Sequence, residues 1–188
     1  MPFSQSGQLS AIVREIERLT PSSILDVGTG MGQYGFLARN NLENINLFII
    51  EEGKGRQSPK SQWRVRIDGI EGFADYLTPV HEYVYNQMMI GNALDILPGL
   101  AARQYELVMA IDILEHFDMP TGERFLAELK RVASGHVLVS TPKSFIHQEV
   151  EANPLENHRS LWTADDLARN GFTHLIPDAE SWIAVCNI

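Results

Sequence analysis

Side chains able to do chemistry follow two short apolar runs in this sequence. The first is Asp26, which ends the run "SILD" and precedes glycines at positions 28, 30, 32 and 35. The second run, "AIDILEHF", carries Asp112, Glu115 and His116. Glycines after a strand let the backbone approach a ligand closely, whereas neighbouring carboxylates and imidazoles hold a metal ion or move protons. The sequence therefore predicts two groups of functional residues.

The glycine-rich segment permits three interpretations. The window Gly30-x-Gly32-x-x-Gly35 fits the dinucleotide fingerprint of NAD(P)-dependent oxidoreductases, although this pattern alone is weakly specific. Asp26 argues against that interpretation, because a carboxylate beside the loop repels a pyrophosphate and instead orients a cationic ligand. The third interpretation is a turn whose glycines serve packing only.

The elements that must position these residues alternate between strands and helices. Apolar runs predict strands at 22–28, 63–73, 88–90, 105–111, 135–142, 172–176 and 181–188. Amphipathic or capped segments predict helices at 9–19, 33–42, 74–88, 121–133 and 163–170, and the helix at 74–88 is expected to be interrupted near Pro79. This alternation is typical of parallel βαβ units in a doubly wound α/β sheet. The short "PDAE" turn before the final strand predicts that this strand is antiparallel.

Length and composition limit the classes of function. The 188 residues predict a single domain over 1–188 with one core. The net charge of −9 argues against nucleic acid as a partner, because such binding needs a basic surface. One cysteine excludes an intramolecular disulfide, and neither a signal peptide nor an 18-residue apolar run is present. We expect a cytoplasmic protein with no membrane contact, and the sequence does not indicate an oligomeric state.

The order of motifs resembles a known family. The segment Asp26-Val27-Gly28-Thr29-Gly30-Met31-Gly32 is similar to motif I of the class I S-adenosylmethionine-dependent methyltransferases. The later segments "IDGIE", "IGNALDILP", "LVMAIDILEHF" and "VLVSTP" resemble the later motifs of that family in the same order. The resemblance implies a three-layer α/β/α fold with a seven-stranded sheet in the order 3-2-1-4-5-7-6, strand 7 being antiparallel. It also implies S-adenosylmethionine as the cofactor.

Two carboxylates compete for the role of ribose ligand. Glu51 lies about 20 residues beyond the glycine loop, which is the usual spacing for this role. Glu71 lies farther on, but its segment "WRVRIDGIE" leads directly into the next helix and strand and would otherwise have no place in the sheet. We therefore favour Glu71, which makes residues 42–62 an insertion. The apolar part of this insertion is expected to pack on the domain, with Glu51 and Glu52 facing solvent or the pocket rim.

The resemblance also implies further contacts with the cofactor. Asn92 and Ala93 correspond to the residues beside the adenine, although the family usually has Asp where Asn92 stands. The expected cofactor-binding residues are Asp26, Gly28, Thr29, Gly30, Gly32, Glu71, Asn92, Ala93 and Asp112.

The second acidic group has three interpretations. In the first, Asp112 lines the methionine end of the cofactor pocket while Glu115 and His116 begin a helix. In the second, Glu115 and His116 join the distant His158, with Asp112, in a divalent metal site, similar to that of ubiquinone-pathway O-methyltransferases and small-RNA 2′-O-methyltransferases. In the third, His116 or His158 acts as a general base without a metal. The expected catalytic residues are Asp112, His116 and His158.

These observations favour one function over two others. The favoured function is S-adenosylmethionine-dependent methyl transfer to an O or N atom of a small soluble acceptor. The alternatives are an NAD(P)-binding oxidoreductase and a non-catalytic protein that binds S-adenosylmethionine as a partner subunit. Arg159 is a candidate for binding a substrate carboxylate, and Trp63, Phe145 and Trp162 are candidates for the pocket wall or the core.

Overall fold

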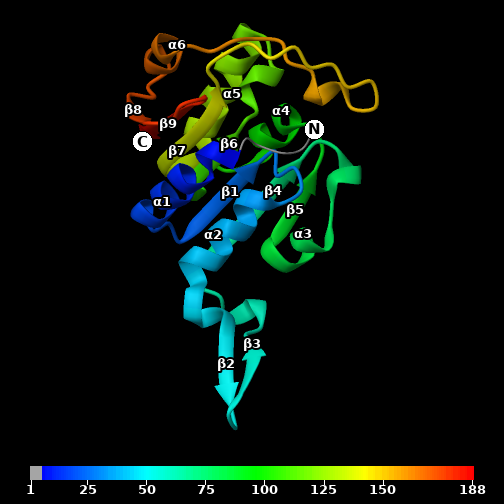
Figure 1. Cartoon of the computed structure of the whole chain (residues 1–188), viewed down its shortest axis with the longest axis vertical. Coiled ribbons are helices and arrows are strands. Elements are labelled where there is room, and N and C mark those ends of the chain that lie inside the picture. The colour runs from blue at the N-terminus through cyan, green and yellow to red at the C-terminus, as the bar shows by residue number, and fades with distance from the viewer. Residues whose placement is uncertain (1–5) are drawn as a thin grey trace.

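A computed structural model describes residues 6–188 and contains a seven-stranded sheet (Figure 1). Its order is β5-β4-β1-β6-β7-β9-β8, which confirms the predicted order 3-2-1-4-5-7-6. The strands are β1 (Ser23–Val27), β4 (Arg66–Glu71), β5 (Gln87–Ile90), β6 (Tyr105–Ile111), β7 (Ala133–Pro142), β8 (His174–Ile176) and β9 (Ser181–Asn187).

The direction of the strands follows from their connections. The first five strands in the order run parallel, and β9 pairs antiparallel with both β7 and β8. The short turn before Ser181 returns the chain beside β8, whereas helical crossovers join the parallel strands. In β1 and β6 nearly every side chain is buried, because helices cover both faces of the sheet.

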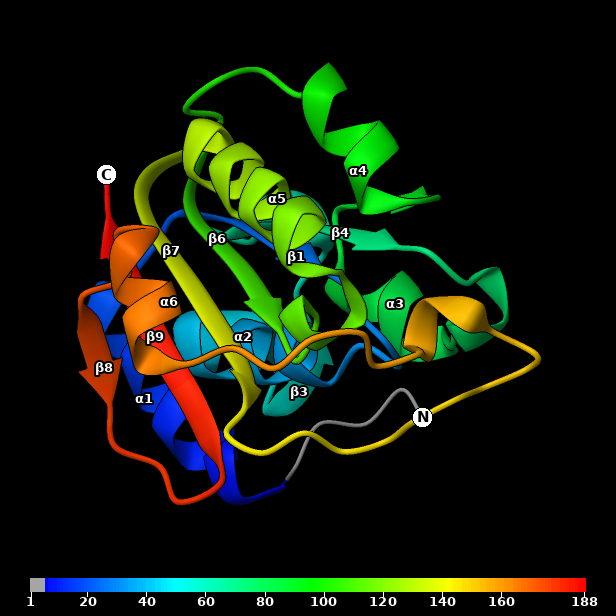
Figure 2. The same cartoon turned by 90° about the horizontal axis from the view of Figure 1, so that it is seen from above.

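Helices form the two outer layers (Figure 2). One face is covered by α1 (Leu9–Leu19), α2 (Gln33–Glu43) and α3 (Pro79–Val84), and the other by α4 (Ala93–Ile96), α5 (Met119–Val132) and α6 (Ala164–Arg169). Each layer has its own apolar core, one around Ile16 and Met109 and the other around Leu126 and Trp162. The helix predicted for 74–88 is shorter than expected, because Thr78 caps a helix that begins at Pro79. Within residues 6–188, no helix is long and apolar enough to cross a membrane.

A two-stranded hairpin lies outside the main sheet. It comprises β2 (Phe48–Glu51) and β3 (Lys54–Gln57) and projects from the body of the domain (Figure 1). The prediction that the apolar run packs on the domain holds for Leu47, which is buried, and is wrong for Phe48 and Ile50, which are 60% and 76% exposed. None of residues 44–62 lines the main pocket, so Glu51 and Glu52 face solvent and not a pocket rim.

Candidate functional site

The main pocket lies at the carboxyl ends of the parallel strands, where ligands bind in open α/β sheets. Its volume is about 310 Å³. Eight residues singled out from the sequence line it: Gly28, Gly30, Glu71, Asn92, Ala93, Asp112, His116 and Arg159. The fold thus gathers residues that are up to 131 positions apart, counted from Gly28 to Arg159.

The loop after β1 needs glycine for conformation and for space. Gly28, Gly30 and Gly32 all have positive φ angles, at 74°, 54° and 86°. A Cβ atom at Gly28 would lie 1.9 Å from Cδ1 of Ile113. The Ile113 side chain would have to move to make room for it. The loop therefore exposes backbone at the floor of the pocket, in the way that a closely bound ligand requires.

Glu71 joins the glycine loop to the end of β4. Its Oε2 accepts a hydrogen bond from the Gly30 backbone N–H at 2.8 Å, and its Oε1 accepts one from the Phe73 N–H at 2.9 Å. Burial raises the pKa of Glu71 above its ordinary range. The Thr29 hydroxyl also donates to Oε2 at 3.4 Å, whereas Oε1 keeps a further lone pair for a ligand hydroxyl. The alternative candidate, Glu51, lies on the projecting hairpin and pairs with Arg56.

Three residues expected to bind the cofactor do not line the pocket: Asp26, Thr29 and Gly32. Asp26 points into the α2/α3 side of the sheet, where the Tyr85 hydroxyl donates to its Oδ2 at 2.6 Å. Burial raises the pKa of Asp26 to about 7. The carboxylate is thus placed beneath the glycine loop, where it positions the start of α2 and has no direct path to the pocket.

His81 supports the loop and was missed by the sequence analysis. Its Nε2 lies 3.2 Å from the Thr29 hydroxyl and 3.1 Å from the Gly30 carbonyl oxygen. Its Nδ1 accepts from the Thr78 N–H at 3.0 Å, which completes the cap of α3. The sequence feature that could have indicated this role is the spacing of Thr78 and His81 at the start of a helix, which is the spacing of a capping box.

Asn92 has a structural task besides its place in the pocket. Its Oδ1 accepts a hydrogen bond from the Leu94 N–H at 2.9 Å and so caps α4. A ligand amine that donates to this oxygen would therefore share it with the Leu94 N–H of the helix cap. The side-chain NH₂ group is the donor that Asn92 offers in addition.

Asp112 is held in an uncommon conformation at the end of β6. Its φ angle is 53°, a value that non-glycine residues seldom adopt. The Ser140 hydroxyl donates to its Oδ1 at 2.7 Å, and the Gln8 amide donates to its Oδ2 at 2.5 Å. Both oxygens are fixed by elements far apart in sequence. The N-terminal segment therefore forms part of the support of the pocket.

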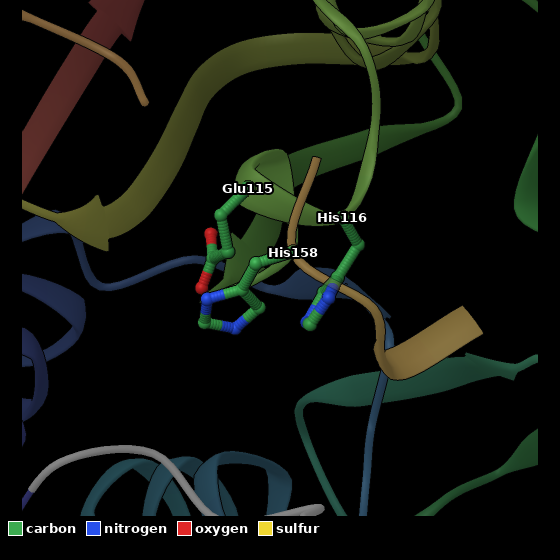
Figure 3. A group of neighbouring side chains, drawn as sticks. All are labelled: Glu115, His116 and His158. Carbon is green, nitrogen blue, oxygen red and sulfur yellow. The ribbon is translucent and has the colours of Figure 1, made fainter. Parts of the chain in front are cut away.

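Glu115, His116 and His158 converge, as one of the three interpretations expected (Figure 3). One ligand atom from each lies within 4.8 Å of the others. His158 Nδ1 lies 2.7 Å from the Ile146 carbonyl oxygen and His116 Nδ1 lies 3.4 Å from that of Asn157. Carbonyl oxygens accept, so these contacts assign the protons to Nδ1 and leave Nε2 of both rings with a lone pair. Asp112 is not among the converging atoms.

The electrostatics of this cluster are set mainly by burial. Burial raises the pKa of Glu115 to about 8, and nearby Asp112 contributes in the same direction. Burial lowers the pKa of His116, as does His158 beside it, and burial also lowers the pKa of His158. At pH 7 the cluster accordingly holds neutral imidazoles and a protonated carboxyl that can donate its proton.

Glu115→Gln is expected to stabilise the metal-free protein increasingly as pH rises from about 5 to 8. The folded chain binds the Glu115 proton more tightly than the unfolded chain, whose carboxyl has its ordinary pKa of 4.5, so wild-type stability falls with pH over this window. Glutamine keeps the shape and can accept from Thr141 but carries no titrating proton. Thermal unfolding at pH 5, 6, 7 and 8 measures the gap in melting temperature. A constant gap would contradict the assignment.

An irregular segment supplies part of the pocket wall, and Arg159 alone among its lining residues was a candidate from the sequence. Residues 143–163 run past the carboxyl ends of the strands (yellow to orange in Figure 2), and Asn153, Pro154, Leu155, Glu156 and Arg159 line the pocket. Leu155 packs against Gly72, where a Cβ would lie 2.6 Å from its Cδ1. Tyr76 also lines the pocket. No motif marks these residues, because the segment is irregular and only the fold brings it to the strand ends.

The aromatic candidates do not line the pocket. Trp162 is fully buried in the core and donates from Nε1 to the Leu114 carbonyl oxygen at 3.2 Å. Trp63 stacks with the Arg39 guanidinium, 4.4 Å from the ring centre. Phe145 is half exposed. Of the two interpretations offered for Trp162, the structure supports the core role.

No protein-family model matches the chain, and no curated protein matches its sequence. Solved structures do share its fold. A proposed O-methyltransferase from Nostoc punctiforme PCC 73102 is 18% identical with a TM-score of 0.63, and the match covers 95% of this chain but only 55% of that one. Magnesium protoporphyrin IX methyltransferase from Synechocystis PCC 6803, solved with bound S-adenosylmethionine, is 14% identical with a TM-score of 0.60, over 96% and 77% of the two chains. A methyltransferase dependent on S-adenosylmethionine from Aquifex aeolicus is 15% identical with a TM-score of 0.60, over 98% and 94%.

Proposed function

We propose that this chain, which has the fold of the class I S-adenosylmethionine-dependent methyltransferases, transfers a methyl group from S-adenosylmethionine to an O or N atom of a small acceptor. The observation that carries the proposal is the shared pocket of Gly28, Gly30, Glu71 and Asp112 at the carboxyl ends of β1, β4 and β6. A floor of glycines with positive φ angles, with carboxylates on two sides, suits a ligand that has both ribose hydroxyls and a cationic group.

The residues present fit each part of this cofactor. Glu71 would accept hydrogen bonds from the ribose hydroxyls, and the backbone of Gly28 and Gly30 would lie against the chain of the methionine. Asn92 and Ala93, at the end of β5, would lie beside the adenine. Asp112, held by Gln8 and Ser140, would orient the methionine ammonium or the acceptor.

The chemistry of the chain's own residues is positioning and proton transfer. S-adenosylmethionine supplies a methyl group that is already activated by the sulfonium. The pocket would orient the acceptor atom and exclude water, with Leu155 and Tyr76 closing one side. His116 lines the pocket and its lowered pKa keeps it neutral at pH 7, so its Nε2 would accept the acceptor's proton.

Calorimetric titration tests the cofactor. S-adenosylmethionine and S-adenosylhomocysteine are both expected to bind and to raise the melting temperature, because binding to the folded state alone stabilises it. NAD(H) and NADP(H), the ligands of the oxidoreductase alternative, are expected to give neither heat nor stabilisation. The non-catalytic alternative predicts cofactor binding with no methylated product from pools of small hydroxyl and amine acceptors. Absence of heat and of thermal shift with both S-adenosyl ligands would refute the proposal.

A metal-assisted form of the same reaction is the second candidate. The convergence of Glu115, His116 and His158 favours it, because one carboxylate and two imidazoles with lone pairs on Nε2 are a ligand set for a divalent transition metal. The Nδ1 contacts with backbone carbonyls are the outer interactions that orient histidine ligands. A metal held there, at the acceptor end of the pocket, would polarise an acceptor oxygen.

A further inference from the structure

The hairpin of β2 and β3 has one apolar and one charged face. Register pairs Phe48 with Gln57 and Ile50 with Gly55, so the side chains of Phe48, Ile50 and Gln57 share a face on which Gly55 adds none. Ile49, Glu51, Lys54 and Arg56 occupy the other face, where Arg56 contacts Glu51 at 3.1 Å. The apolar face has no covering element in the described part of the chain, since Phe48 and Ile50 remain 60% and 76% exposed.

The base of the hairpin is firmly attached to the domain. Glu43 is fully buried and accepts from the Val65 N–H at 2.7 Å, which ties the end of α2 to the start of β4. Arg39, also buried, donates to the Val84 carbonyl and to Asn86. Both ends of the inserted segment are therefore tied to the body of the domain. A two-stranded hairpin alone is only marginally stable in water, so this exposed apolar face has a cost that a partner would remove.

The outer edge of β2 has unused backbone groups. The Ser58 N–H donates to the Leu47 carbonyl, so odd-numbered residues of β2 direct their backbone groups towards β3 and even-numbered residues direct theirs outward. The Phe48 N–H is used by the Ile45 carbonyl. This leaves the Phe48 carbonyl and both backbone groups of Ile50 directed away from β3. Such an edge is a template for another strand.

We propose that this edge binds a second copy of the same chain, so that two hairpins form a four-stranded antiparallel sheet. A two-fold axis through Ile49 places the Ile50 N–H of each copy opposite the Phe48 carbonyl of the other. The same register sets the Phe48 side chain beside Ile50 of the second copy, twice, as an aromatic and β-branched cross-strand pair. The Ile50 N–H groups, the Phe48 carbonyls and the apolar side chains are thus self-complementary in one register.

Charge distinguishes this edge from the outer edge of β3. A two-fold pairing of β3 centred on Gly55 sets Lys54 against Arg56 of the second copy, and one centred on Arg56 sets two arginines together. Like charges directly opposed are destabilising. The β2 register brings no like charges together. Residues 44–62 carry three cations and two carboxylates, whereas the whole chain has a net charge of −9. The two copies would therefore meet through a segment that is not acidic. The projecting hairpins would keep the acidic bodies of the two domains apart.

Cysteine cross-linking tests the register directly. At a two-fold axis through Ile49, the two copies of Ile49→Cys are a non-hydrogen-bonded cross-strand pair, whose Cα atoms lie about 4.5 Å apart and within disulfide range. Arg56→Cys is the matched control, because Arg56 lies opposite Ile49 on the β3 strand and on the other edge of the hairpin. The native Cys186 is buried and contributes little background.

Mild oxidation is expected to give a covalent dimer of Ile49→Cys but not of Arg56→Cys. Sedimentation of the wild-type chain is expected to show a concentration-dependent species of twice 21.1 kDa. Ile50→Lys, which places a charge on the apolar face without touching the core, is expected to abolish that species and leave the melting temperature of the monomer unchanged. A wild-type chain that stays monomeric at about 100 μM would overturn the proposal. So would equal cross-linking of the two cysteine variants, or cross-linking of Arg56→Cys alone. Cofactor titration is independent of all these outcomes.

Discussion

Glu71→Ala is expected to weaken S-adenosylmethionine binding on the order of 100-fold, whereas Glu51→Ala leaves the affinity unchanged. Each hydrogen bond to a charged group contributes about 1.5 to 3 kcal/mol, so loss of two ribose contacts costs about 3 kcal/mol or more. Glu71 also receives the Gly30 and Phe73 N–H groups, so the loop that forms the pocket floor loses its attachment to β4. Glu51 has no such contact, since it lies on the hairpin and pairs with Arg56.

Calorimetry of both variants measures this difference, with thermal unfolding as the check that each is folded. Glu71→Gln provides a matched control, because the amide keeps the size of the side chain and one acceptor oxygen but no charge. We expect its affinity to fall between those of the wild type and Glu71→Ala. If Glu51→Ala lost binding and Glu71→Ala kept it, the ribose site would belong to the hairpin and the pocket assignment would be wrong.

The choice between these carboxylates shows which parts of a sequence predict structure. Spacing from the glycine loop favoured Glu51, but the requirement that every strand has a place in the sheet favoured Glu71. The structure pairs β4 with β1 through residues 66–70 and leaves β2 outside the sheet. Buried strands and capped helices are local patterns, so the elements themselves were predictable, whereas the order of the seven strands was an expectation from the resemblance to the methyltransferase family. The place of an inserted hairpin is decided by surface contacts that leave no periodic signal.

The direction of individual side chains was less predictable than their place in the fold. Asp26 lies in the strand before the glycine loop, as expected, but the alternation of side chains along β1 points it away from the pocket and towards Tyr85. Asp112 reaches the pocket because its positive φ angle and the contacts with Gln8 and Ser140 turn it there. Neither the backbone angle nor the contact with residue 8, over 100 positions away, is readable from the sequence around "AIDILEHF".

The convergence of Glu115 and His116 with His158 was one of three interpretations of the sequence, and only the folded structure shows that the three side chains are close together. The pairing of Glu115 and His116 is visible in the sequence, but His158 is 42 positions from His116 and belongs to the irregular segment after β7. Backbone contacts fix that segment: the Arg159 and Ser160 N–H groups both donate to the Glu115 carbonyl. This attachment is what sets the His158 ring 5.0 Å from the His116 ring.

Addition of Mn²⁺ at pH 8 is expected to raise the melting temperature by on the order of 5 to 10 °C. A metal at 100 times its Kd stabilises the folded state by about 2.7 kcal/mol, and each kcal/mol raises the melting temperature of a chain of this size by about 2 to 4 °C. The effect is expected to be smaller at pH 6, because the raised pKa of Glu115 keeps its carboxyl protonated there and a metal must displace that proton.

Glu115→Gln and His158→Ala are each expected to abolish the Mn²⁺-dependent shift. His174→Ala is the control for non-specific binding, because His174 lies in β8 and is exposed, and it should retain the full shift. Calorimetric titration with Mn²⁺ and with Mg²⁺ on the same variants measures affinity without any methyl acceptor. A wild-type chain that shows no shift at millimolar Mn²⁺, while still binding S-adenosylmethionine, would assign the cluster to the metal-free alternative. His116 would then be the remaining candidate for the proton acceptor, because it lines the pocket and His158 does not.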